Sequence, residues 1–97
     1  MNAIRIVILT QQDCGSCEAA KAIVERLARK YPLSVSAILF DSSDGISLAE
    51  EGGVLFPPGI FINGKRFSYG GLSGRRLRME IERLLSSQDA TTVDGSL

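Results

Sequence analysis

The two cysteines of the chain, Cys14 and Cys17, are separated only by Gly15 and Ser16. Two thiols at this spacing can close a small disulfide and can cycle between that disulfide and a dithiol. An apolar run precedes the pair and a helical pattern follows it, so the cysteines fall in the first turn of a predicted helix. Unpaired backbone N–H groups and the helix dipole favour a thiolate there. The pattern therefore predicts thiol–disulfide redox chemistry.

The remaining composition narrows the chemistry open to this pair. The chain has 97 residues and no histidine, which removes Cys–His nucleophilic catalysis and the commonest zinc ligand. With only two thiols a zinc site would need carboxylates or a second chain, so no metal ligands are assigned. The formal net charge of +0 gives no reason to expect nucleic acid or an anionic membrane as a partner. The apolar run over residues 4–9 is too short for a membrane span or a signal peptide, and we expect a cytoplasmic protein.

Hydrophobic periodicity predicts one domain over residues 1–85, followed by a polar tail over residues 86–97 that we expect to be disordered. Residues 3–10 are mostly apolar and β-branched, which indicates a buried strand. Apolar residues then recur at three- and four-residue spacing as far as Tyr31, which indicates an amphipathic helix. Residues 33–40 form a second apolar run, and the helix between the two strands predicts a parallel crossover.

The second half of the chain predicts a different arrangement. A capping box at residues 47–50 marks a short helix. The turn signal Asn63-Gly64 joins two short strands into an antiparallel hairpin. A last amphipathic helix follows, from a cap at Ser73 to Leu85. The expected fold class is α/β, with a central four-stranded mixed sheet flanked by helices.

Three motifs occur in an order that is typical of one large family. They are Cys14-Gly15-Ser16-Cys17, the segment Leu48-Ala49-Glu50 with Gly53-Val54, and Pro58 to Gly64 followed by Gly70-Gly71. Together with the order βαβ, short helix, ββα, these motifs make the chain resemble the thioredoxin superfamily over roughly residues 3–85. The hairpin half is most similar to glutaredoxins and small glutaredoxin-like thioredoxins. The resemblance implies a thioredoxin-like fold and protein-disulfide reductase activity.

The resemblance also implies roles for individual residues. Cys14 would attack a substrate disulfide, Cys17 would resolve the mixed disulfide, and Pro58 would be a cis-proline facing them. The helix position agrees with this division, because a first-turn thiol meets more free N–H groups and more solvent than one three residues further on. The residues expected to contact substrate in the neighbouring loops are Pro57, Pro58, Gly70 and Gly71.

The chain departs from the family pattern beside the cysteines. In the family, the residue before the cis-proline offers its N–H and C=O to the substrate chain, whereas Pro57 has no N–H. We expect Pro57 to accept a hydrogen bond but not to donate one, at a cost of roughly 0.5–1.5 kcal/mol. The alternative is that Pro57 and Pro58 only stiffen a loop.

A second departure is Asp13, which stands where thioredoxins carry an aromatic residue just before the first cysteine. Either Asp13 or Cys14 would cap the helix, and the negative charge of Asp13 would oppose formation of a thiolate at Cys14.

Three arginines, Arg75, Arg76 and Arg78, crowd the start of the last helix, where the helix dipole disfavours cations. One hypothesis is a positive rim, with Arg75 and Arg76 in contact with an anionic partner near the cysteines. The alternative is that the arginines solvate the helix and pair with Glu80 and Glu82.

Three functions remain open. The favoured one is a thiol–disulfide oxidoreductase that exchanges the Cys14–Cys17 disulfide with a protein or glutathione-type disulfide. A soft-metal carrier for copper or zinc could use the same thiols, although the heavy-metal-associated fold ends in a strand. A thioredoxin-like interaction module without redox turnover is the third. We expect a monomer without a bound cofactor, reduced by a reductase or by glutathione as co-substrate. Leu72-Ser73, where glutaredoxins commonly carry an acidic residue for the glutathione amine, weighs against glutathione.

Overall fold

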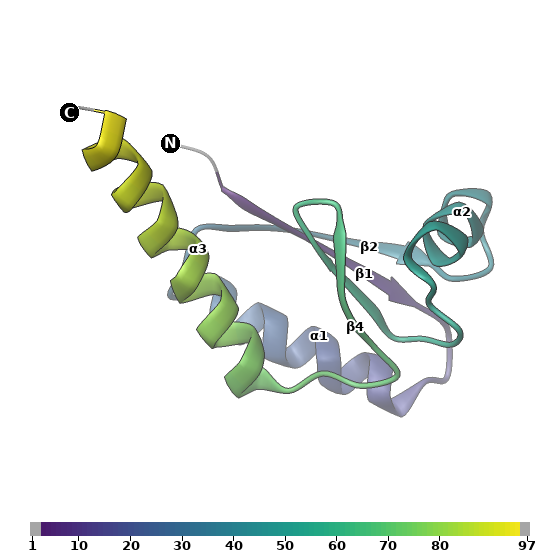
Figure 1. Cartoon of the computed structure of the whole chain (residues 1–97). Coiled ribbons are helices and arrows are strands. Elements are labelled where there is room, and N and C mark those ends of the chain that lie inside the picture. The colour runs from purple at the N-terminus through teal and green to yellow at the C-terminus, as the bar shows by residue number, and fades with distance from the viewer. Residues whose placement is uncertain (1–2, 96–97) are drawn as a thin grey trace.

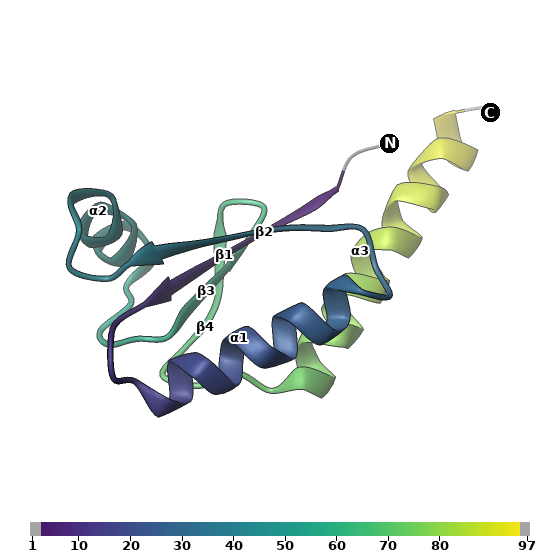
Figure 2. The same cartoon turned by 180° about the vertical axis from the view of Figure 1, so that it is seen from behind.

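A computed structural model describes the backbone of residues 3–95 and the side chains of residues 3–87. It contains a four-stranded sheet and helices packed against it (Figure 1, Figure 2). In chain order the elements are β1 (Ile4–Thr10), α1 (Gly15–Ala28), β2 (Leu33–Leu39), α2 (Ser43–Gly52), β3 (Gly59–Ile62), β4 (Lys65–Tyr69) and α3 (Gly74–Gly95). Within this range no helix combines the length and apolar character that a membrane span needs.

The sheet is mixed, with the strand order β2-β1-β3-β4. β1 and β2 are parallel, because α1 carries the chain back to the starting end of the sheet, while β3 is antiparallel to both β1 and β4. The hairpin turns at the predicted Asn63-Gly64, whose φ angles of 51° and 88° are those that a tight turn requires. The predicted α/β class and four-stranded mixed sheet are confirmed.

The two faces of the sheet bury separate hydrophobic clusters. Figures 1 and 2 place α1 and α3 over one face, while α2 lies at the end where β1 and β2 finish. Successive side chains of β1 point to opposite faces of the sheet, so β1 contributes residues to both clusters. The residues of the larger cluster, below α1 and α3, are Ile4, Ile6, Ile8, Ala20, Val24, Leu27, Ile60, Ile62, Leu77 and Ile81. The smaller cluster, on the α2 side, consists of Leu9, Ala49, Val54 and Phe61.

Two helix boundaries differ from the sequence prediction. α2 begins at Ser43, because the hydroxyl of Ser42 accepts a hydrogen bond from the N–H of Gly45 at 3.0 Å. The capping box predicted at residues 47–50 is therefore wrong, and those residues lie inside the helix. α3 continues to Gly95 although its apolar stripe ends at Leu85. The helix therefore covers residues 86–95, where the sequence indicated a polar tail, while residues 96–97 lie outside the described part. The disorder of residues 86–97 stays a prediction.

Candidate active site

Cys14 and Cys17 form a disulfide at the N-terminus of α1, with their Cα atoms 5.2 Å apart. Cys14 is the N-cap residue, and its backbone is extended, with φ of −120° and ψ of 103°. Its sulfur accepts a hydrogen bond from the N–H of Cys17 at 3.1 Å, and its C=O accepts one from the N–H of Glu18 at 3.1 Å. Cys14 therefore caps α1, and the alternative cap at Asp13 is not formed.

The two cysteines differ sharply in exposure. Cys17 is 0% exposed and lies on the buried face of α1, in the same stripe as Ala20 and Val24. Cys14 is only half-buried. A disulfide from another molecule can therefore reach the sulfur of Cys14 but not that of Cys17. This asymmetry supports the predicted division of labour between the cysteines.

Three predicted modulating residues surround the disulfide. Asp13 is exposed and has a positive φ of 54°, a conformation that asparagine and aspartate adopt more readily than most residues. A Cβ built at Gly15 would have no atom within 4 Å, so the space there is open. The hydroxyl of Ser16 lies 3.6 Å from the sulfur of Cys14. These residues leave one side of the disulfide open to solvent.

The register of the sheet brings Pro58 and Gly70 to the cysteine end. β3 begins at Gly59, which pairs with Leu9 on one side and with Tyr69 on the other. Pro58 precedes Gly59 and Gly70 follows Tyr69, so both lie at the end of the sheet where β1 leads into the loop that carries the cysteines. The N–H of Gly70 donates to the C=O of Pro58 at 2.8 Å, which fixes the two loops to each other.

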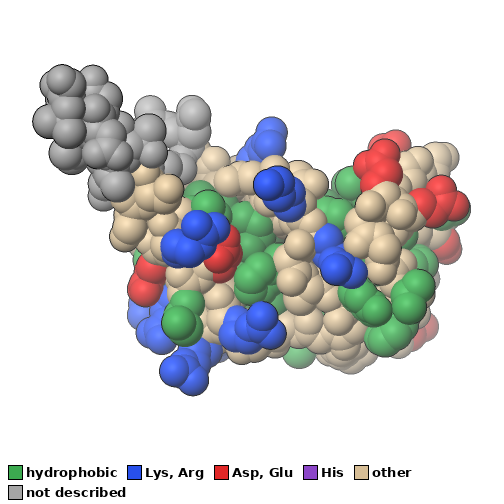
Figure 3. Space-filling model, in the orientation of Figure 1, with side chains coloured by type: hydrophobic (Ala, Val, Ile, Leu, Met, Phe, Trp, Pro, Cys, Tyr) green, Lys and Arg blue, Asp and Glu red, His purple; other side chains and the backbone are tan. Residues whose placement is uncertain are grey.

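The loop before β3 exposes large apolar side chains next to Pro58 and Gly70. The peptide bond between Pro57 and Pro58 is cis, as the family resemblance implied. Leu55 and Phe56 are 73% and 54% exposed, and the ring of Phe56 meets that of Tyr69 edge to face. In Figure 3, hydrophobic side chains gather below α2. The sequence pattern predicted only a rigid break here, although two large apolar residues before a Pro-Pro pair are a usable signal for an exposed contact surface.

The sequence pattern also did not single out Thr10, the last residue of β1, as a residue of the site. It is 5% exposed, and its hydroxyl has no hydrogen-bond partner among the described residues. Alternation along β1 puts its side chain on the same face as Ile8, which packs against α1. The available signal was a hydroxyl residue at the end of an apolar strand, directly before the cysteine loop.

Two arginines near the start of α3, Arg75 and Arg78, lie beside the C-terminal half of α1. A Cβ built at Gly74, the first residue of α3, would contact the side chain of Ile23 at 3.3 Å, well along α1 from the disulfide. Arg75 and Arg78 line a depression there together with Arg26 and Lys30 of α1. α3 therefore begins beside the C-terminal half of α1, and contact of Arg75 and Arg76 with an anionic partner stays a prediction.

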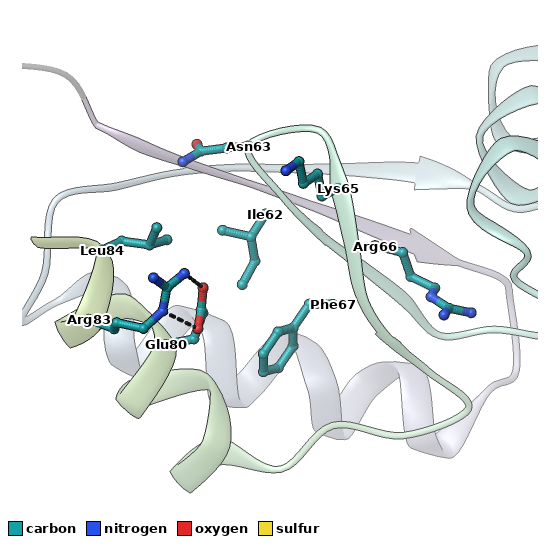
Figure 4. A pocket seen from close by; sticks show the side chains of 8 residues that line it. All are labelled: Ile62, Asn63, Lys65, Arg66, Phe67, Glu80, Arg83 and Leu84. Carbon is teal, nitrogen blue, oxygen red and sulfur yellow. Dashed lines mark hydrogen bonds and ion pairs between the residues drawn. The ribbon is translucent and has the colours of Figure 1, made fainter. Parts of the chain in front are cut away.

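The alternative pairing of these arginines with Glu80 and Glu82 is not formed either. Glu80 binds Arg83, with N–O distances of 3.0 and 2.6 Å (Figure 4), and this ion pair lowers the pKa of Glu80. Glu82 accepts a hydrogen bond from the hydroxyl of Tyr31 at 2.5 Å. The described residues contain no ion pair that involves Arg75. The N–H of Arg76 instead bonds the hydroxyl of Ser73 at 3.2 Å, so the predicted cap at Ser73 is confirmed.

Comparison with known proteins decides the family. No family model matches the sequence. A thioredoxin from Methanocaldococcus jannaschii is 33% identical over 64 residues, which are 66% of this chain and 75% of that protein. The chain belongs to the thioredoxin superfamily. A solved structure, a point mutant of a thioredoxin from Halobacterium salinarum NRC-1, matches with a TM-score of 0.67 and 24% identity, over 84% of this chain and 74% of that one.

Membership of the thioredoxin superfamily fits the arrangement at the end of the sheet. The fold and the disulfide-bonded pair together support a thiol–disulfide redox function. The narrower likeness to glutaredoxins stays a prediction. As for the soft-metal alternative, the described residues contain no group of three or more histidine, cysteine or acidic side chains that could hold a metal ion.

Proposed function

We propose that this chain is a thiol–disulfide oxidoreductase that reduces disulfides in proteins. The observation that carries the proposal is the difference in exposure within one disulfide: Cys14 is half-buried at the helix cap and Cys17 is 0% exposed behind it. A pair built in this way offers one sulfur for attack and keeps the second for resolution.

The reduction proceeds in two exchanges. The thiolate of Cys14 attacks one sulfur of the substrate disulfide; that S–S bond breaks, and the other sulfur leaves as a thiolate that takes up a proton. Cys17 then loses its proton and attacks the sulfur of Cys14, which releases the second substrate thiol and re-forms the Cys14–Cys17 disulfide. Two electrons pass from the dithiol to the substrate. A reductase, or two molecules of glutathione, returns the protein to the dithiol.

The loops beside the disulfide favour an extended peptide as the substrate. The C=O of Pro57 can accept one hydrogen bond from a bound chain, as in strand addition. Leu55 and Phe56, which are 73% and 54% exposed, offer an apolar surface next to it. A substrate segment with large apolar side chains near its disulfide therefore fits this site better than a small, strongly charged disulfide does.

A protein-disulfide reduction assay tests the proposal with three proteins: the native chain, Cys14→Ser and Cys17→Ser. We expect turnover only for the native chain, and we expect Cys17→Ser to accumulate a covalent mixed disulfide through Cys14, visible by mass spectrometry. Copper and zinc are measured on the same samples. Turnover by Cys14→Ser, or native protein that contains stoichiometric metal and reduces nothing, would overturn the proposal.

The electron donor is tested in the same assay. Glutathione with glutathione reductase is compared with a thioredoxin reductase, each supplied with NADPH. We expect the native chain to turn over with at least one of these donors. Because Leu72-Ser73 lacks an acidic partner for the glutathione amine, we expect the thioredoxin reductase to be the better donor.

A further inference from the structure

The sheet has two outer edges, and only one of them is protected against pairing with another strand. β4 is five residues long, begins with Lys65 and Arg66, and has a register irregularity where it pairs with Ile60 and Phe61 of β3. Charges and bulges are common means by which edge strands avoid such pairing. β2 is seven residues long, contains no charge and no proline, and keeps an uninterrupted register with β1. Its edge is open.

The pairing with β1 determines which backbone groups of β2 point outward. At the start of β2 the C=O of Pro32 accepts from the N–H of Ile4 at 2.9 Å. At its end the N–H of Phe40 donates to the C=O of Thr10 at 2.7 Å. Even-numbered positions therefore turn toward β1, and alternation in a parallel strand turns the odd-numbered ones away from it. The outward-facing residues are Leu33, Val35, Ala37 and Leu39.

At each end of β2, one outward-facing backbone group already has a hydrogen-bond partner within the chain. The N–H of Leu33 donates to the C=O of Tyr31 at 2.9 Å. The C=O of Leu39 accepts from the N–H of Ser42 at 3.1 Å and from its hydroxyl at 2.7 Å. The groups that remain directed outward are the C=O of Leu33, the N–H of Leu39, and both backbone groups of Val35 and Ala37.

We propose that β2 pairs antiparallel with β2 of a second copy of this chain, about a two-fold axis through Ser36. In this register Val35 of each copy faces Ala37 of the other, and the two residues exchange both backbone hydrogen bonds. The N–H of Leu39 then donates to the C=O of Leu33 in the other copy. Every outward-facing backbone group of β2 that lacks a partner within its own chain then forms a hydrogen bond across the pair. The N–H of Leu33 and the C=O of Leu39 keep their hydrogen bonds within the chain.

The side chains of β2 suit the same pairing. Val35 and Leu39 are 40% and 47% exposed, although they lie on the face that packs against α1. In the paired strands they would face Ala37 and Leu33 of the other copy, so apolar side chains meet apolar side chains. On the opposite face, Ser36 of each copy meets its own equivalent, whose hydroxyl can donate or accept.

Charge also favours a second copy as the occupant of this edge. Exposed Lys30 precedes β2 and exposed Asp41 follows it. Antiparallel pairing brings the start of one strand beside the end of the other, so these opposite charges approach across the pair. The formal net charge of +0 means that two copies do not repel each other overall. The sequence alone led us to expect a monomer, because the open edge becomes visible only from the strand order.

The affinity should be modest. One strand from each copy gives an interface at the small end of specific interfaces, so we expect a reversible dimer with a Kd on the order of 10–100 μM. Sedimentation equilibrium of the full chain across this concentration range should show a mass that rises from one chain to two. A constant mass of one chain would overturn the proposal, and so would species larger than two chains, because a two-fold pair is closed.

Two variants at position 37 distinguish pairing through the outer edge of β2 from a dimer formed through any other surface. Ala37→Pro removes an outward N–H and no hydrogen bond to β1, whereas Ala37→Val keeps the N–H and lengthens the side chain. We expect Ala37→Pro to remain a single chain at every concentration and Ala37→Val to dimerise as the native protein does. Equal dimerisation by both variants would overturn the proposal. Circular dichroism confirms that each variant is folded.

Amide hydrogen exchange tests the register without a variant, and so covers the case in which Ala37→Pro does not fold. The N–H groups of Val35 and Ala37 should exchange quickly in dilute protein and at least tenfold more slowly when the dimer predominates. The N–H groups of Ser34 and Ser36, which bond to β1, serve as controls and should be protected at all concentrations. Dimer formation without added protection at Val35 and Ala37 would place the interface elsewhere.

Discussion

The backbone N–H of Cys17 donates a hydrogen bond of 3.1 Å to the sulfur of Cys14, from the first turn of α1 to its cap. We expect this N–H to face the cap position in the reduced protein as well, where it can bond a thiolate and lower its energy. Through this bond, ionisation of Cys14 would be linked to the folding of the helix that buries Cys17.

The charge at Asp13 should limit the thiolate fraction of Cys14. Replacing it by asparagine removes a like charge beside the sulfur, so alkylation of the reduced protein at neutral pH should accelerate about two- to threefold at low salt and less at high salt. Glu25→Gln, which removes a charge further along α1, is the matched control and should change little. A slower reaction of Asp13→Asn would contradict this expectation. Peptide mapping should show that Cys14 is modified before Cys17.

Restoring an N–H at Pro57 should strengthen the binding of peptide disulfides. Pro57→Ala gives the loop the donor that proline lacks, so the KM for a peptide disulfide should fall about 2- to 10-fold, as one hydrogen bond predicts. A small disulfide without peptide groups is the control substrate and should show an unchanged KM. An equal change for both substrates would mean that the substitution acts through the loop's shape and not through the added donor.

The hydroxyl of Thr10 should cost stability in the oxidised protein. It is buried without a partner in the described part of the chain, so Thr10→Val should raise the free energy of unfolding by roughly 1 kcal/mol. Thr10→Ser keeps the hydroxyl and loses the methyl group, and should lower it by about 1 kcal/mol. Urea denaturation of the three proteins measures both changes. A loss of stability in Thr10→Val would show that the hydroxyl has a partner.

The hydrogen bond between Tyr31 and Glu82 should give the protein an alkaline stability limit. This bond, then burial, and then the charge of Glu82 raise the pKa of Tyr31 above its usual 10.0. Because the raised pKa favours neutral Tyr31 in the folded state, its contribution is complete below pH 10.0 and is lost as the pH rises through the folded value.

A comparison with Tyr31→Phe isolates this contribution. The difference in unfolding free energy between the two proteins should stay constant at neutral and mildly alkaline pH, and should shrink as Tyr31 ionises. Glu82→Gln is the control, since it removes the charge that the ionised tyrosine would meet. A difference that is unchanged through the titration of Tyr31 would show that the hydrogen bond does not form in solution.

Much of the fold and the centre of the site could be predicted because their signals are local. The cysteine spacing, the Asn63-Gly64 turn and the period of the apolar residues each act within a few positions. The start of α2 was missed because Ser42 and Ser47 are both followed by acidic residues, and only the packing selects between them. The position of Arg75 was missed because the crossing of α3 over α1 is a tertiary property that no pattern within either helix encodes.

In the proposed function, the sheet separates the cysteines, which exchange electrons, from the loop that contacts the substrate. α1, with Cys17 at its buried face, rests on one hydrophobic cluster, whereas the loop that carries Leu55 and Phe56 follows α2 and rests on the other. Substitutions in the smaller cluster can therefore reshape the selecting loop while the thiol chemistry keeps its support. The two properties can diverge independently, so proteins built on this plan can acquire new clients without a new catalyst.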